Sequence, residues 1–145
     1  MLRRTLFVGA SALVLLYGGV AWSQDDKGYE TQLQLQARSL PEIRAAILAA
    51  TGYEETSIEL RPAPHQLVIT VVNSKLVDGS GADRIDEATA IASAVTEATA
   101  TRPQFHDIEA LHIDYVRRKE GKGTQTVDAI DFRKDPSGKF RHHVS

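Results

Sequence analysis

The chain has 145 residues, of which 25% are charged and none is cysteine, and its formal net charge at pH 7 is −2. This length suits one domain with a modest core, and without cysteine the chain forms no disulfide and offers no thiol chemistry. The near-neutral balance lacks the basic stripe that nucleic-acid binding requires, so we expect no nucleic-acid partner.

The first 23 residues have the three parts of a secretory signal peptide. Two arginines open the segment, an apolar run follows, and Ala21-Trp22-Ser23 puts small residues where signal peptidase acts. We expect cleavage after Ser23 and a periplasmic or secreted bacterial protein, because cysteine-free exported chains fit a bacterial periplasm. An uncleaved anchor is the alternative. The apolar run is short for a membrane helix, which needs ~20 residues, so no stable span is expected after cleavage.

Residues 24–38 are polar, and we interpret them as a flexible leader in which alternating Gln and Leu residues could form a short edge strand. A helix is predicted from Ser39 to Gly52. Ser39 suits the N-cap with Glu42 three residues on, and glycine suits the helix end. Its apolar stripe comprises Leu40, Ile43, Ala46, Ile47 and Ala50.

Two strands follow this helix. Thr56–Arg61 alternates between apolar and polar residues, and His65–Val72 is apolar on both faces, as in an interior strand. The intervening Pro62-Ala63-Pro64 is predicted to break the sheet, because proline cannot donate to a strand ladder.

The longest predicted helix is Asp83–Thr101. Asp83 is the preferred N-cap, with Ser80 as the alternative, and Pro103 stops the helix. Its narrow, alanine-rich stripe indicates close packing on a sheet, and pairing with another helix is the less favoured interpretation. The stripe comprises Ile85, Ala88, Ile91, Ala92, Val95 and Ala98; Asp83, Arg84, Asp86, Glu87, Ser93 and Glu97 point elsewhere.

The remaining residues predict further strands. Ile108–Arg117 alternates, and Thr124–Arg133 does so with a change of parity between Val127 and Ile130 that a bulge would explain. A turn over residues 134–138 then leads to a short last strand carrying Phe140, His142 and Val144. The predicted fold is an α+β two-layer sandwich over residues 39–145, in the order α-β-β-α-β-β, with one more strand as an alternative. Both helices would cover one face of a mostly antiparallel sheet.

In an exported chain, the α-β-β-α-β order over roughly Ser39 to Arg117 resembles the BON domains of bacterial envelope proteins. The resemblance is one of element order. The strand His65–Val72 lacks the glycine that is typical of the second strand of that family. The resemblance implies an envelope-binding module.

Histidine and carboxylate side chains are the candidates for chemistry. His112 and Asp114 share a strand face, and with His142 from another strand they could form a metal site. Solvated histidines are the simpler interpretation. The nucleophile motifs G-x-S-x-G and S-x-x-K are absent. Gly79-Ser80-Gly81 is interpreted as a turn rather than a phosphate site, since it has no P-loop lysine.

Two basic clusters are candidates for binding anionic lipid headgroups or an acidic partner, although soluble loops are the simpler interpretation. One cluster lies at a predicted hairpin tip and the other surrounds the last turn. The first comprises Arg117, Arg118, Lys119 and Lys122, and the second comprises Arg133, Lys134, Lys139 and Arg141.

The sequence therefore favours a small exported binding or interaction module without catalysis or cofactor. Its partner would be an envelope protein or cell-surface component. The contact surface would be the sheet face bearing His112, Asp114 and Val116, or an edge strand. The alternative is a small metal-binding protein or hydrolase that uses His112, Asp114 and His142.

Overall fold

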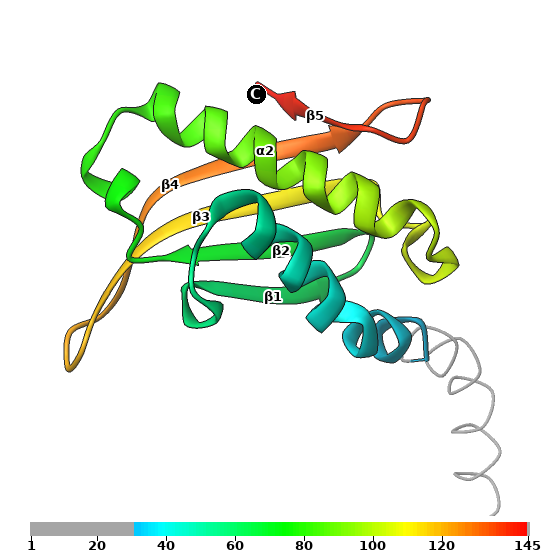
Figure 1. Ribbon diagram of the computed structural model, residues 1–145, viewed down its shortest axis with the longest axis horizontal. Helices are drawn as coiled ribbons and strands as arrows, with labels where there is room; N and C mark the ends of the chain where they lie inside the picture. The colour runs from blue at the N-terminus through cyan, green and yellow to red at the C-terminus, as the bar shows by residue number, and fades with distance from the viewer. Residues whose placement is uncertain (1–30, 145) are drawn as a thin grey trace, which may run out of the picture. The chain divides into compact units, whose positions relative to one another are not determined.

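The computed structural model describes residues 31–144, and the chain divides into two units between Gln34 and Leu35. The predicted signal peptide and its cleavage point lie outside the described residues. The second unit, described as far as residue 144, contains two α-helices and a five-stranded open sheet that is mostly antiparallel (Figure 1). The predicted α+β class is confirmed.

The first helix covers residues 31–51, so the predicted start at Ser39 and the predicted strand before it are wrong. Gln36, Leu40, Ile43 and Ile47 follow one another at helical spacing, and all except Leu40 are buried. This helical spacing of buried residues extends through the segment in which Gln and Leu alternate. The segment therefore continues the helix, although the alternation alone suggested a strand.

Ser39 therefore lies inside the helix, where its hydroxyl donates to the carbonyl of Leu35 at 3.4 Å instead of capping. The predicted helix end is confirmed. Gly52 has φ 76, and its N–H donates to the carbonyl of Leu48 at 2.8 Å. Glycine suits this position because the left-handed region is strained for most other residues.

The strands follow one another across the sheet in chain order. β2 and β3 are parallel, because helix α2 (Gly81–Ala100) crosses between them, and the other neighbouring pairs are antiparallel. The short first and last strands are the sheet edges. The strands are β1 (Ile58–Ala63), β2 (Gln66–Val72), β3 (Ala110–Lys119), β4 (Gly123–Lys134) and β5 (Phe140–His143).

Pro62 does not break the sheet as predicted. It lies within β1, paired with Leu67 of β2, and is tolerated there because β1 is an edge strand. The chain turns at Pro64 and His65 instead, and His65 has φ 58. Of the predicted break, only its last residue, Pro64, lies in the turn.

The bulge predicted in the fourth strand is confirmed. Tyr115 pairs with Asp128 and the next residue, Val116, pairs with Thr126, so Val127 is the extra residue. The bulge keeps Ile130 on the buried side of β4, where it is 4% exposed.

Helix α2 is capped by Ser80, the alternative of the two predicted caps. The Ser80 hydroxyl accepts from the N–H of Asp83 at 3.1 Å, so the preferred assignment of Asp83 is wrong. Asp83 instead lies in the first turn, where a carboxylate suits the positive end of the helix dipole.

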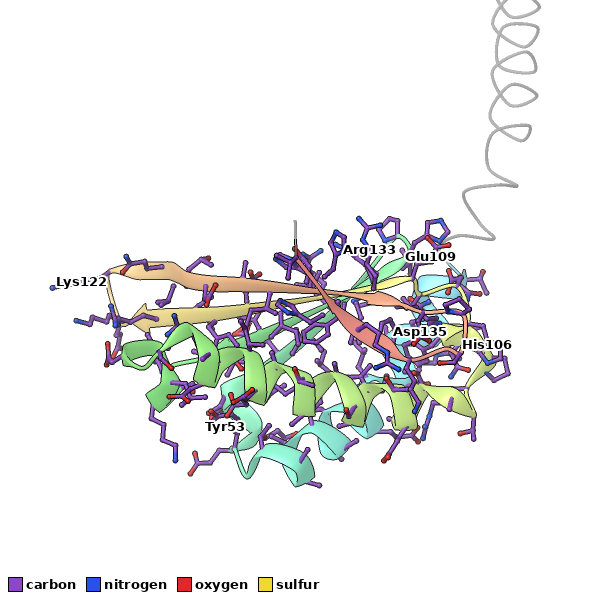
Figure 2. The ribbon with its side chains drawn as sticks, turned by 90° about the horizontal axis from the view of Figure 1, so that it is seen from above. Tyr53, His106, Glu109, Lys122, Arg133 and Asp135 are labelled. Atoms are coloured by element: carbon purple, nitrogen blue, oxygen red, sulfur yellow. The ribbon has the colours of Figure 1, made fainter. Side chains whose placement is uncertain are left out.

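Both helices lie on one side of the sheet, as Figure 2 shows, and Arg133 lies on the other side. No other element of residues 35–144 covers that second face. The core fills the space between the layers, and alanines at 88 and 92 let α2 lie close to the sheet. Its fully buried centre includes Ile43, Ile47, Ile91, Val95, Leu67, Ile69, Leu111, Ile113 and Tyr115.

Candidate functional site

The polar centre of the uncovered sheet face is His112 on β3. Its Nδ1 lies 2.6 Å from Oδ1 of Asp131 on β4, and its Nε2 lies 2.9 Å from Oδ1 of Asp114 on its own strand. Strand geometry produces this cluster, because Asp114 is two residues along and Asp131 is paired directly opposite His112. The sequence placed His112 and Asp114 on one face but did not bring in Asp131.

The two carboxylates set the charge of this histidine. Burial lowers the pKa of His112, but the hydrogen bond with Asp131 and the charges of Asp114 and Asp131 outweigh it, so the pKa lies above its ordinary value of 6.5. Both ring nitrogens face carboxylate oxygens, and both carry hydrogen only in the cation. The cluster is therefore an ion bridge between β3 and β4.

His142 does not join this cluster. It is paired with Phe132 of β4, so it lies on the helix side of the sheet, and the two rings are 5.7 Å apart. The residues of β5 on the His112 side are Arg141 and His143, and His143 is opposite Asp131. Within residues 31–144, no group of three or more histidine or carboxylate side chains is arranged to hold a metal ion.

The basic hairpin cluster is partly neutralised by neighbouring acids. Arg117 pairs with Asp78, and Arg118 pairs with Glu59. Lys119 and Lys122 remain exposed near the tip, and Figure 2 shows Lys122 at the end of the molecule opposite Arg133. The two predicted basic clusters are thus separated in space.

The second basic cluster is divided between the two sheet faces. Arg141 donates from Nε to Asp135 at 2.9 Å, and the Lys134 ammonium lies 5.4 Å from the centre of the Phe140 ring. Burial lowers the pKa of Lys134. The negative charges of Asp107 and Glu109 raise it, but burial has the larger effect. Lys139 is exposed, and its ammonium makes no ion pair with residues 31–144.

A polar network between the layers was missed by sequence reasoning. The Glu87 carboxylate on α2 accepts from the hydroxyls of Tyr53 at 2.7 Å and Tyr115 at 3.0 Å. The Tyr53 hydroxyl also lies 2.6 Å from that of Ser74, which caps the 3-10 helix Lys75–Asp78. The network joins the first loop, α2 and β3.

Burial and the charge of Glu87 make both tyrosines harder to ionise. Burial is the largest cause for each of them, and it raises the pKa of Tyr53 to about 12. The pKa of Tyr115, whose side chain is fully buried, is raised further. Both phenols therefore act as neutral donors that hold the carboxylate in place.

Ser80 and its glycines serve the start of α2, as interpreted from the sequence. The Ser80 hydroxyl is used by the cap, and the Arg84 guanidinium donates to the carbonyls of Leu76 at 2.9 Å and Gly79 at 2.8 Å. Arg84 also pairs with Asp128 on β4 at 2.9 Å. These bonds fix the turn against the sheet.

A groove of about 480 Å³ lies beside the sheet edge, between α2 and the pair β4 and β5. Phe132 and Phe140 form an aromatic base and are 1% and 8% exposed. The lining from α2 is Thr89, Ser93, Thr96 and Glu97, and that from the sheet is Phe132, Lys139, Phe140, Arg141 and His142. The groove is thus apolar at its base and charged at its rim.

The sequence did carry a signal for the position of His142. Phe140 and His142 have the same parity in the last strand, so burial of Phe140 places His142 on the helix side. The distance between α2 and β5, which creates the groove, has no such signal.

No helix in residues 31–144 is both long and apolar enough to cross a membrane. In comparisons with known proteins, no family model, curated protein or solved structure matches the chain. The similarity to BON domains therefore stays a prediction based on element order.

Proposed function

We propose that this protein is a small exported binding module of the bacterial envelope, without catalysis, that holds a partner in the groove between α2 and β5. Export is supported by the signal-peptide pattern at the start of the sequence. The observation that carries the binding role is the groove itself, an aromatic-based hollow beside an edge strand.

The groups that catalysis commonly uses are tied into the fold. Ser74 and Ser80 use their hydroxyls as caps, both nitrogens of His112 face carboxylates, and Glu87 accepts from two tyrosines. A hydroxyl nucleophile needs a base within hydrogen-bond reach. These residues instead stabilise helix starts and strand pairs, which favours binding over chemistry.

The alternative of a metal-binding protein or hydrolase required His142 beside His112 and Asp114. The register of β5 places His142 on the opposite sheet face from the other two. This separation favours the binding module over the alternative.

The groove also suits recognition better than the other surfaces that the sequence indicated. On the uncovered sheet face, His112 is already paired with two carboxylates, and in the hairpin two arginines are paired with acids. A ligand there would have to break these contacts, whereas the groove offers open volume beside an edge strand and the unpaired Lys139 ammonium.

The test is photo-crosslinking of the full chain in intact cells. A benzophenone amino acid replaces Lys139 at the groove rim or, in the matched control, Lys122 at the hairpin tip. We expect a discrete crosslinked partner from position 139 and none from position 122. Crosslinks from neither position would refute the binding module, and crosslinks from position 122 alone would refute the groove as its site.

A further inference from the structure

The edge strand β5 has backbone groups that β4 does not use. The N–H of Asp135 donates to the carbonyl of Lys139 at 2.8 Å, so these two residues form a hydrogen-bonded pair at the turn between β4 and β5. This pair determines which of the following residues bond across the two strands. Alternate residues of an antiparallel strand pair on opposite sides, so Arg141 and His143 bond to β4. The N–H and C=O groups of Phe140 and His142 then face the open edge, beside the groove.

We propose that the groove takes an extended peptide from a partner protein, added to β5 as a sixth strand. This deepens the proposed function and rests on it. Main-chain hydrogen bonds to Phe140 and His142 would hold the peptide backbone, and alternate side chains would enter the groove. The α2 wall carries small hydroxyl residues, which leave room for such side chains.

The groove chemistry defines the kind of peptide. Of the two rings at the base, Phe132 is 1% exposed and Phe140 8%, so an apolar side chain would contact mainly Phe140 and the methyl groups of the α2 threonines. Lys139 lies at the rim with an unpaired ammonium, so an acidic residue next to the apolar one complements it. The expected ligand is an extended segment that combines an apolar anchor with a carboxylate.

A second copy of the chain is the less favoured occupant. β5 has four residues, so two such edges would meet along only roughly 13 Å of strand. Stable protein interfaces bury about 1,200–2,000 Å² in total, which this edge alone does not supply. A flexible peptide follows the edge and fills the groove at the same time.

The test begins with random twelve-residue peptides displayed on phage and selected on the immobilised full chain. We expect the selected peptides to share an apolar residue near an acidic one. A synthetic selected peptide is then titrated against His142→Pro and His142→Ala by calorimetry. Both variants lack the imidazole and differ at the outward N–H, so the proline variant should bind at least ~10-fold more weakly.

A second pair of variants leaves β5 unchanged. Thr89→Trp fills the α2 wall of the groove and should abolish peptide binding, whereas Thr124→Trp, on β4 at the hairpin, should leave it unchanged. Enrichment of no peptide would overturn the inference, as would equal affinity of the His142 variants. If the chain associates with itself and His142→Pro abolishes that association, the edge binds a second copy, and the peptide inference is overturned as well. Crosslinking from position 139 would then still support the binding module.

Discussion

Nδ1 of His112 lies 2.6 Å from Oδ1 of Asp131, and this contact joins β3 to β4 on the sheet face that the helices leave uncovered. The imidazole also faces Asp114 through its other nitrogen, so the protonated ring donates one N–H to each of the two carboxylates. The contact makes the stability of the sheet depend on pH near neutrality.

The first prediction concerns that pH dependence. The folded-state pKa of His112 is raised above 6.5, so its contribution to stability is fully present below about pH 6.5 and is lost as pH rises through the raised pKa. The free energy of unfolding of wild type should fall relative to His112→Gln as pH rises, by less than about 1 kcal/mol because the pair is partly exposed.

Urea unfolding at several pH values measures this difference. Asp131→Asn serves as a control, since it weakens the contact from the other side and should reduce the same pH dependence. Parallel curves for wild type and His112→Gln would show that the ion bridge contributes nothing.

The second prediction concerns the network under α2. Glu87→Ala leaves the hydroxyls of Tyr53 and Tyr115 without their carboxylate, so it should lower the free energy of unfolding by about 3 kcal/mol. The neighbouring Asp86 is exposed, so Asp86→Ala should change the free energy of unfolding by no more than about 0.5 kcal/mol. Equal effects of the two substitutions in chemical denaturation would contradict the network.

The third prediction concerns ionisation of Tyr53, whose pKa is raised to about 12 by burial, with Glu87 adding to the rise. Removing the negative charge with Glu87→Gln should lower the pKa of Tyr53, while burial keeps it above 10. Because other tyrosines titrate too, the measurement compares absorbance titrations of Tyr53→Phe and wild-type chains, each with and without Glu87→Gln. An unchanged Tyr53 titration would place Glu87 away from the hydroxyl.

The fourth prediction separates the two possible caps of α2. Ser80→Ala removes the acceptor of the Asp83 N–H and should lower the free energy of unfolding by about 1 kcal/mol. Asp83→Ala removes only a favourable charge at the helix start and should cost a few tenths, about 0.3 kcal/mol. A larger loss from Asp83→Ala in thermal unfolding would reverse the assignment.

Local periodicity predicted much of the fold. The stripe through Ile91 and Val95 and the alternation through Leu111 and Ile113 fix which side of each element is buried. The parity change before Ile130 even located the bulge. These features need only the neighbours along one element, so the sequence contains them.

The rest of the candidate site depends on pairing between elements. Asp131 reaches His112 through the register of β3 and β4, and Glu87 is half-buried only because Tyr53 and Tyr115 come to it from distant parts of the chain. Helical period alone placed Glu87 off the apolar stripe of α2 and gave it no partner. Polar residues that bridge layers are therefore missed by periodicity, because their partners lie in other elements.

The central claim is that β5 offers its outward backbone to an extended peptide, and amide hydrogen exchange of the full chain tests it most directly. With a selected peptide bound, the His142 amide should become protected, while the His143 amide, already bonded to β4, should change little. Protection of neither amide, or equal gains at both, would contradict strand addition at this edge.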